Sequence, residues 1–367
     1  MLKKREYVMY EPIFKLKIKA DAGIETAVWE IKKREQDRKI LPLPGISGEK
    51  ICLMMTEELM NTVQNLQMIY KKVSKKNKVK DLILLDAYHS ATIEGARTTV
   101  ENVKNTFFKP KTKDDKMVIN TVKGCNYAYQ NLIDEASIRT LWEIVVEDVC
   151  ENESKAGTMY RNGMVFIGNE SRIIHVPAKP ENLPDMMKKL FWFLENEDMD
   201  VILKGFVLHF YFVYLHPFCD GNGRTARIWT ASYLYHNGYE KMVYLPLSRT
   251  INENLSGYYG NLIDSEWKYE KQGEKYLDIT PFIFYMLEIF EKCMITSILE
   301  ENELTGQQRT ILVKMKKRGS GAEITVKNAR KILGETEENT KEVLQTLVEI
   351  GYLYKTLKDD SEIYILK

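Results

Sequence analysis

One stretch in the middle of the chain gathers side chains that could act on a phosphate group: His216-Pro217-Phe218-Cys219-Asp220-Gly221-Asn222-Gly223-Arg224-Thr225-Ala226-Arg227. Glycine costs a helix interior roughly 1 kcal/mol relative to alanine, so Gly221 and Gly223 indicate a turn or a close approach by another group. The free N–H groups of such a turn, where it leads into a helix, form a nest for an anion. The pattern therefore predicts a phosphate-binding loop followed by a helix.

The charged and titratable residues of this stretch fit the same chemistry. Arg224 and Arg227 lie one helical turn apart and can clamp phosphate oxygens with paired N–H donors. Asp220 can hold Mg²⁺, which usually binds through one or two carboxylates together with substrate phosphates. His216 is a candidate general base, because its ordinary pKa lies close to operating pH.

The stretch resembles the signature of the Fic family, HPFx(D/E)GNGRxxR, at every specified position, although the family often has Gly where Ala226 stands. The resemblance implies a mostly helical enzyme that transfers AMP from ATP, with Mg²⁺, to a Tyr, Ser or Thr hydroxyl of a target protein and of itself, releasing pyrophosphate. It implies that His216 is the catalytic base and that Asp220 holds the metal. The implied nucleotide-binding residues are Asp220, Gly221, Asn222, Gly223, Arg224, Thr225, Ala226 and Arg227. Among them, Asn222 and the two glycines would stabilise the developing phosphate charge, and the arginines would bind the β- and γ-phosphates.

A second motif, Ser90-Ala91-Thr92-Ile93-Glu94-Gly95, ends an expected helix. Ser90 and Glu94 are four residues apart and therefore share one helix face. The segment resembles the Fic inhibitory motif, (S/T)xxxE(G/N), in the subclass that carries it on a helix N-terminal to the core. The resemblance implies that Glu94 inhibits the enzyme by pairing with Arg224. Ser90 would either orient Glu94 or cap the helix locally.

Two further segments resemble parts of a Fic active site. Residues 163–168 and 172–177 are two short β-branched runs around a turn, which predict a hairpin. Its position matches the family's flap, to which a target segment can add as a β-strand. The flap residues expected to dock the target are Ser171, Arg172, Ile173 and Ile174. Tyr258 and Tyr259 resemble the adenine-side segment, where an aromatic ring can stack on the base; core tyrosines are the alternative.

Three interpretations of the function stay open from the sequence. The first is AMP transfer held in check by Glu94. The second uses the same site to remove AMP from a modified protein, with Glu94 positioning a water, or to transfer another nucleotide, phosphate or phosphocholine. The third is a transcriptional regulator whose core senses nucleotide and whose C-terminal unit binds DNA.

The C-terminal residues 305–367 predict three helices, at 307–317, 325–333 and 336–350, and a hairpin formed by residues 353–356 and 363–366. This order of elements resembles a winged helix-turn-helix. The third helix would enter the DNA groove, but it opens with Glu337, Glu338 and Glu342 against a single lysine. Acids near phosphates weaken binding, so DNA is not the expected partner and stays an alternative.

The composition limits the other partners and the compartment. The 367 residues carry 53 basic and 52 acidic side chains, a net charge of +1, which gives no whole-chain case for nucleic acid or an anionic membrane. No apolar run approaches the roughly 20 residues of a membrane span, and no signal-peptide pattern occurs at the N-terminus. Five scattered cysteines without C-x-x-C spacing are typical of reduced thiols, so the expected location is the cytoplasm and Cys219 is interpreted as a bystander.

The apolar periodicity predicts the helices that position these motifs, at 51–76, 79–94, 118–132, 136–150, 184–194 and 201–215. The helix at 201–215 is apolar nearly all round, which indicates burial, and it delivers His216 at its end. Residues 41–45, Leu-Pro-Leu-Pro-Gly, indicate a turn or linker.

The predicted fold is therefore mainly α, and the resemblance divides it into three parts. These are an N-terminal helical extension (1–80), a helical Fic core (81–300) with a β-hairpin flap and an inhibitory helix at about 80–95, and a winged helix-turn-helix domain (301–367). A homodimer is implied only by analogy with relatives.

Overall fold

The computed structural model describes residues 10–75, 79–150, 158–169, 172–301, 304–316, 318–319, 321–349, 351–358 and 361–366. The chain forms two compact units, Tyr10–Ser297 and a smaller one that begins at Ile298. Both units are mainly helical, which confirms the predicted fold class. The three-part division at residues 80 and 300 stays a prediction.

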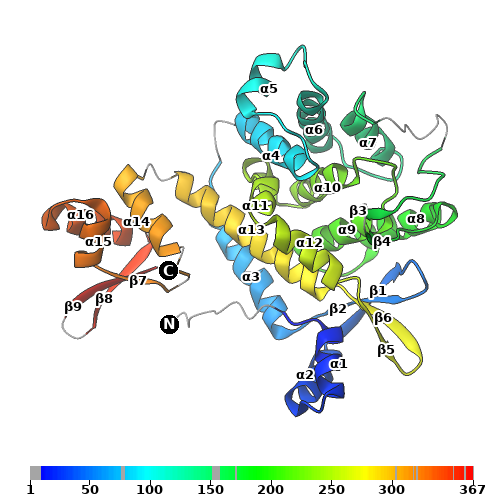
Figure 1. Cartoon of the computed structure of the whole chain (residues 1–367), viewed down its shortest axis with the longest axis horizontal. Helices are drawn as coiled ribbons and strands as arrows, with labels where there is room; N and C mark the ends of the chain where they lie inside the picture. The colour runs from blue at the N-terminus through cyan, green and yellow to red at the C-terminus, as the bar shows by residue number, and fades with distance from the viewer. Residues whose placement is uncertain are drawn as a thin grey trace. The chain divides into compact units, whose positions relative to one another are not determined.

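The larger unit is built around α9 (Val201–Leu215) and α10 (Asn222–His236), which pack side by side. Nearly every side chain of α9 is buried, as expected for a helix that is apolar all round. Helices α4 (Val79–Ile93), α6 (Lys113–Gln130) and α7 (Ile138–Val146) contact α10, as Figure 1 shows for α4 and α6. The start of α10, which carries the signature motif, is thereby fixed from several sides.

The remaining helices complete this unit. They are α1 (Ile13–Asp21), α2 (Glu25–Gln36), α3 (Glu57–Lys72), α5 (Val100–Thr106), α8 (Leu183–Asn196), α11 (Leu247–Glu253), α12 (Leu255–Asp264) and most of α13 (Thr280–Glu301), with short 3-10 helices at Pro180–Asn182 and Glu240–Tyr244. Within the described ranges, no helix combines the length and the apolar character needed to cross a membrane.

A four-stranded sheet in the order β1-β2-β6-β5 also belongs to the larger unit. Its strands are β1 (Arg38–Pro44), β2 (Lys50–Met54), β5 (Lys268–Lys271) and β6 (Glu274–Asp278). The prediction of a turn or linker at 41–45 is wrong for residues 41–44, which belong to the edge strand β1, where proline is tolerated. Leu41 and Leu43 lie on the same face of this strand and are buried. The prediction of a helix from residue 51 is also wrong at its start, because residues 51–54 belong to β2, which pairs in parallel with β6 through residues 50–52.

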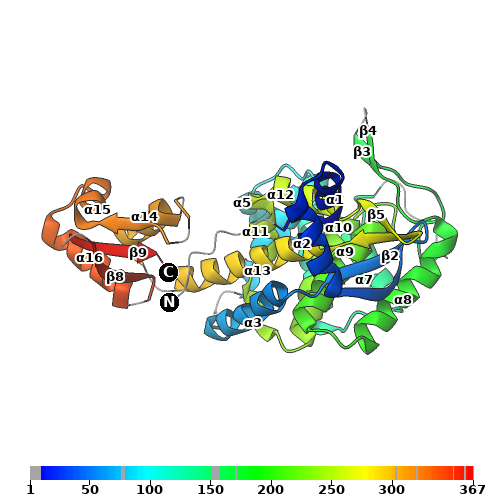
Figure 2. The same cartoon turned by 90° about the horizontal axis from the view of Figure 1, so that it is seen from below.

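The predicted hairpin is present but shorter than expected. Strands β3 (Ile167–Asn169) and β4 (Arg172–His175) pair antiparallel, with an irregularity between Ile167 and Gly168. Figure 2 shows this hairpin projecting from the body of the larger unit. Such a projecting edge is open to pairing with another chain.

The smaller unit contains α14 (Gly306–Lys316), α15 (Val326–Leu333) and α16 (Glu337–Glu349), together with a sheet in the order β7-β9-β8. The strands are β7 (Glu323–Thr325), β8 (Leu353–Lys358) and β9 (Ser361–Leu366). The three predicted helices and the hairpin are confirmed, whereas the three-residue β7 is too short to leave a pattern in the sequence. Residues 317, 350, 359 and 360 of the predicted elements lie outside the described residues. The winged-helix assignment stays a prediction.

Candidate active site

His216 ends α9 in a left-handed backbone conformation, with φ 51° and ψ 60°. This conformation costs a residue other than glycine about 1–3 kcal/mol, and histidine is among the residues that adopt it most readily. Nδ1 of the ring is buried and has no hydrogen-bond partner of ordinary geometry among the described residues. Burial lowers the pKa of His216 to about 4, and His175 acts in the same direction. The ring is therefore neutral at neutral pH, the state that a general base needs.

We expect His216 to stay neutral far below its ordinary pKa. Folding lowers the pKa from 6.5 to about 4, so the unfolded chain takes up this proton first as the pH falls. The free energy of unfolding therefore does not depend on this ring above about pH 6.5. It decreases as the pH falls from about 6.5 to about 4. NMR titration of the imidazole protons, with His216→Ala to assign the signal, measures the midpoint. A midpoint close to 6.5 would contradict this account.

The turn between α9 and α10 is closed by Gly221 and Asn222. Gly221 has φ 74°, and a Cβ there would lie 2.6 Å from Val146 Cγ1, so the position requires glycine. Asn222 is buried; its Nδ2 donates to Phe218 O at 2.8 Å, and its Oδ1 accepts from Phe218 N at 3.0 Å. Both polar atoms of the Asn222 side chain thus bond to the loop itself, and a contribution of Asn222 to phosphate binding stays a prediction. The backbone N–H groups in the first turn of α10 remain as anion donors.

Trp142 of α7 supports the same loop. Its Nε1 donates to Asp220 O at 2.7 Å, and its ring stacks on Phe218 with the centroids 4.7 Å apart. We predict that Trp142→Phe lowers the free energy of unfolding by about 2 kcal/mol, because it leaves a carbonyl without its donor and removes buried ring area. Denaturant unfolding measures the change. Trp192→Phe, at a half-exposed position, is the control and should change the value by less than about 0.5 kcal/mol; equal losses in both variants would contradict the prediction.

Arg224 turns toward α7. It is 1% exposed, its Nη1 donates to Val145 O at 3.1 Å, and its Nη2 lies 3.6 Å from Asp220 Oδ1. Its Nε has no hydrogen-bond partner within the described part of the chain. Burial lowers the pKa of Arg224, so a buried cation here favours the approach of an anion.

Arg227 turns toward α4 instead. Its Nε donates to Ser90 Oγ at 2.8 Å, and its Nη2 donates to Ser90 O at 2.9 Å and to Glu94 Oε1 at 2.6 Å. The predicted pairing of Glu94 with Arg224 is therefore wrong, because Ser90 directs the Arg227 guanidinium to the end of α4 while Arg224 points elsewhere. Ser90 orients the arginine, a role that differs from both of those expected for it.

Glu94 also lies over the first turn of α10. A Cβ on Gly223 would collide with Glu94 Oε1 and would lie 3.2 Å from Arg227 Nη1. Burial acts to raise the pKa of Glu94, but Arg227, with smaller contributions from Arg224 and His216, holds it below its usual value. Glu94 is therefore charged at neutral pH. Its carboxylate, 31% exposed, lies where a helix N-terminus favours an anion, so a phosphate group would compete with it.

Three of the predicted nucleotide contacts are placed in the core. Thr225 and Ala226, both predicted to bind nucleotide, are fully buried in α10, so neither side chain is exposed to a ligand. Tyr258 is 2% exposed and its hydroxyl lies 2.9 Å from His209 Nε2, so the alternative of a core tyrosine is correct for it. Tyr259 is 44% exposed and stays the candidate for stacking on a base.

The predicted flap is the β3–β4 hairpin. Ile173 and Ile174 are 57% and 48% exposed, so they present an apolar surface. Ser171 and the side chain of Arg172 lie outside the described residues. His175, at the end of β4, is anchored at both ring nitrogens: Nδ1 lies 2.6 Å from a Glu266 carboxylate oxygen and Nε2 lies 2.8 Å from Tyr214 O. The hairpin thus combines an exposed strand with a fixed end.

Asp220 is the candidate metal ligand of the loop. Among the described residues, no group of three or more His, Cys, Asp or Glu forms a metal cluster. The Asp220 side chain is 51% exposed, and its Oδ1 accepts a hydrogen bond from Gly221 N. One exposed carboxylate beside an anion-binding helix end fits Mg²⁺, which takes its other ligands from phosphates and water.

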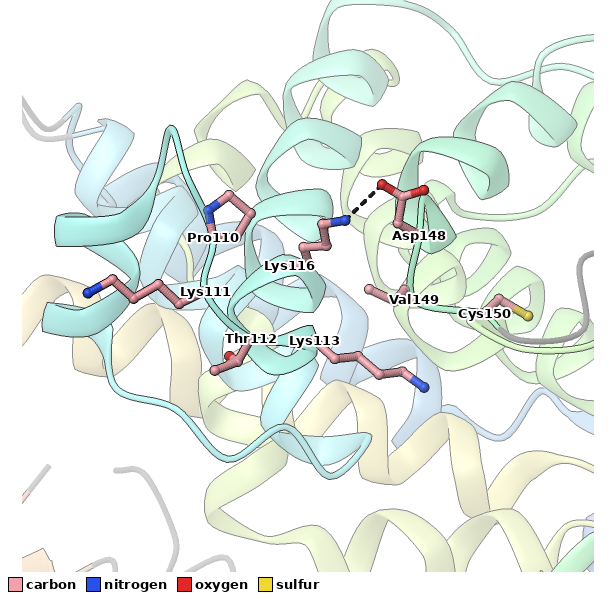
Figure 3. Close-up of a pocket in the computed structure, with 8 residues that line it drawn as sticks. All are labelled: Pro110, Lys111, Thr112, Lys113, Lys116, Asp148, Val149 and Cys150. Carbon is pink, nitrogen blue, oxygen red and sulfur yellow. Dashed lines mark hydrogen bonds and ion pairs between the residues drawn. The ribbon is translucent and has the colours of Figure 1, made fainter.

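A cavity of about 370 Å³ lies between the start of α6, with the residues just before it, and residues 148–150 (Figure 3). It is lined by Pro110, Lys111, Thr112, Lys113, Lys116, Asp148, Val149 and Cys150. Lys116 Nζ pairs with Asp148 Oδ2 at 2.8 Å across it. No signature residue lines this cavity, but Cys150 Sγ lies 3.6 Å from Cys219 Sγ, so the cavity borders the loop.

Sequence reasoning missed two polar residues that position the site. Arg161 donates to the carbonyl oxygen of His216. Asp86 of α4 accepts hydrogen bonds from Ser248 N at 2.6 Å and Ser248 Oγ at 3.0 Å, which ties α4 to α11. Burial raises the pKa of Asp86 to about 6. Each is a single polar residue without a motif around it, so only the tertiary contacts reveal its role.

Comparisons with known proteins point to one family. Residues 132–234 match the Fic/DOC family. The chain is 25% identical to a protein adenylyltransferase Fic of Drosophila virilis over 65% of this chain and 47% of the relative, and 26% identical to that of Drosophila ananassae over 59% and 41%. It therefore spans less than half the length of these curated relatives. The crystal structure of a Fic family protein from Desulfovibrio desulfuricans G20 has a similar fold, with a TM-score of 0.57, 20% identity, and coverage of 85% of this chain and 96% of that one.

Proposed function

We propose that this chain, which carries a Fic/DOC family domain at residues 132–234, transfers AMP from ATP to a hydroxyl side chain of a protein. The observation that carries the proposal is the neutral His216 ring beside an anion site formed by the start of α10 and two buried arginines. The names of the curated relatives, protein adenylyltransferase, support AMP as the transferred group.

In the proposed reaction, His216 takes the proton of the target hydroxyl, and the hydroxyl oxygen attacks the α-phosphorus of ATP. The new O–P bond forms as the bond from that phosphorus to the bridging oxygen breaks, and pyrophosphate leaves. The backbone N–H groups of the α10 first turn donate to the phosphate oxygens as their charge develops. Mg²⁺, held by Asp220, supplies positive charge to the phosphates when it is bound. Arg224 and Arg227 hold the β- and γ-phosphates.

Glu94 inhibits this reaction in the proposed scheme. Its carboxylate pairs with Arg227 and lies over Gly223, which are the positions that the triphosphate needs. Two anions at one helix N-terminus repel each other, so ATP binds in a displaced pose or requires Glu94 to leave. The Glu94 side chain is part-exposed, so part of it already faces solvent.

The target protein docks on the β3–β4 hairpin. Ile173 and Ile174 offer exposed apolar contacts, and an extended target segment can pair with the strand edge through backbone hydrogen bonds. The hairpin end at His175 is anchored beside Tyr214 on α9, two residues before His216. Docking there brings a target hydroxyl toward the base.

The test follows a label from the donor to protein. Glu94→Gly is incubated with Mg²⁺ and ATP labelled at either the α- or the γ-phosphate, and labelled protein is separated. AMP transfer requires label from the α-position only. Label from the γ-position would establish phosphate transfer instead. Loss of AMP from a pre-modified target, without any labelling, would favour AMP removal and overturn the proposal.

A further inference from the structure

Arg161 is a buried cation that has no acidic partner among the described residues. Its side chain is 4% exposed, and no carboxylate within the described ranges lies at ion-pair distance from it. Burial lowers the pKa of Arg161. A buried guanidinium of this kind must be satisfied by neutral acceptors, so its contacts reveal what it holds.

Two of these contacts are the last carbonyls of α9. Nε donates to His216 O at 2.8 Å, and Nη2 lies 3.4 Å from Leu215 O. A helix leaves its final carbonyls unpaired, and a cation is favourable at that end of the helix dipole. The guanidinium therefore holds the turn in which His216 adopts its left-handed conformation.

The other contacts are the two ends of the flap. Nη1 donates to Gly163 O at 2.8 Å, before β3, and Nη2 donates to Ala178 O, after β4. The backbone N–H of Arg161 also donates to Pro217 O at 2.9 Å. One side chain thus joins both legs of the target-docking hairpin to the residue that carries the base.

We propose that Arg161 is a positioning residue for the AMP transfer described above: it fixes the distance between the flap and the His216 ring, and it touches neither ATP nor the target. This inference rests on the proposed function. It predicts a loss in the chemical step with little change in ATP binding, because the hydrogen bonds of Arg161 with the described residues go to the end of α9, to Pro217 and to the flap, and not to α10 or α4.

The experiment compares Arg161→Met and Arg161→Lys in the Glu94→Gly background. Arg161→Met keeps the length and removes every donor, whereas lysine keeps the charge but cannot span four carbonyls. We expect kcat to fall about tenfold or more in Arg161→Met and less in Arg161→Lys, with KM for ATP within about twofold in both. Lys204→Met is the matched control, because Lys204 is also a buried cation, on α9, that donates to a carbonyl, Leu194 O, at 2.9 Å.

A second readout separates this inference from the proposed function. The rate at which diethyl pyrocarbonate modifies His216 is followed by peptide mass, and it should rise several-fold in both Arg161 variants and not in Lys204→Met. This measurement needs no transferase activity. If His216 reactivity and kcat change no more in Arg161→Met and Arg161→Lys than in Lys204→Met, Arg161 is a structural residue only and the inference fails.

A different observation carries a second inference, at the other face of the loop. Cys150 and Cys219 are part-exposed, their Sγ atoms lie 3.6 Å apart, and Cys150 borders the cavity of Figure 3. A disulfide has an S–S distance of about 2.05 Å and needs little rearrangement from such a contact. Cys219 directly precedes Asp220, so bond formation would pull on the predicted metal ligand.

We infer that a peroxide converts this pair into a reversible disulfide that slows the proposed AMP transfer. One thiol sulfur takes an oxygen from hydrogen peroxide and releases one water. The second sulfur then displaces that oxygen as a second water, so two thiols are oxidised and one peroxide is reduced. A shift of the loop by about 1 Å is enough to cost about 10²-fold in rate.

The test treats wild type, Cys150→Ser and Cys219→Ser with hydrogen peroxide and maps disulfides by peptide mass. The inference requires a linked Cys150–Cys219 peptide in wild type only. In the Glu94→Gly background it also requires a loss of transfer that dithiothreitol reverses and that either serine variant prevents. Absence of the linked peptide overturns the inference regardless of transferase activity, and a linked peptide without loss of transfer overturns its regulatory part.

Discussion

His216→Ala, made in the Glu94→Gly background, is expected to reduce AMP transfer to background. General bases contribute about 10²–10⁴-fold to rate, and here the ring is neutral, half-buried and placed at the edge of the anion site by a buried helix. The substitution by alanine removes none of the contacts proposed to hold the nucleotide, so ATP binding should persist. Initial rates with α-labelled ATP and calorimetry of ATP binding measure the two effects.

The matched control for this variant is His236→Ala, at the far end of α10. His236 Nε2 contacts Ala128 O at 2.9 Å and lies away from the signature loop. We expect it to retain transfer within about threefold, as for a change outside the site. Transfer by His216→Ala at a rate similar to His236→Ala would remove His216 from the mechanism.

Glu94→Gly is expected to raise AMP transfer by about tenfold or more over wild type, equivalent to about 1.4 kcal/mol of barrier. The variant frees Arg227 and the N–H groups beside Gly223, which Glu94 covers in the structure. It should also lower the melting temperature, because the buried Arg227 loses its counter-charge. ATP should restore more stability to Glu94→Gly than to wild type, since bound ligand stabilises the form that binds it.

Two variants sharpen this result. Glu94→Gln keeps the shape but removes the charge, so it should activate less than Glu94→Gly. Glu101→Gly, on the exposed surface of α5, is the control for loss of a glutamate and should match wild type in transfer. Equal rates in wild type and Glu94→Gly would show that Glu94 is not inhibitory, whatever reaction the site performs.

The signature loop could be predicted because its chemistry is local. Gly221 has a positive φ, which glycine adopts without strain, and the helix that follows it begins at Asn222. The apolar helix that ends at His216 was also predictable, since burial on all sides leaves a continuous apolar run. The signature loop therefore follows from residues that are near neighbours in the chain.

The contacts between distant segments could not be predicted in the same way. Glu94 meets Arg227 and not Arg224 because Ser90 orients that arginine across two helices. Tyr258 could not be assigned to the core from its spacing, since its partner His209 lies on another helix. Such choices depend on which face of each helix packs against its neighbour.

The sheet shows the same limit at the level of the fold. Strand β2 pairs with β6, and the two are separated by more than half of the chain. The short apolar run at 51–54 lies just before α3, so the spacing of its apolar residues could not distinguish a strand from the first turn of that helix. Arg161 could not be predicted for the same reason. It donates to carbonyl oxygens that only the folded chain places around it, and no pattern in the sequence marks it.

The most direct test of the central claim is the intact mass of wild type, Glu94→Gly and Glu94→Gly/His216→Ala after incubation with ATP and Mg²⁺. The account predicts an increase by one AMP in Glu94→Gly, a weak one in wild type and none in the double variant. That pattern would establish the donor, the base and the inhibitory residue together. No increase in any of the three, with ATP binding still measurable, would contradict AMP transfer by this site.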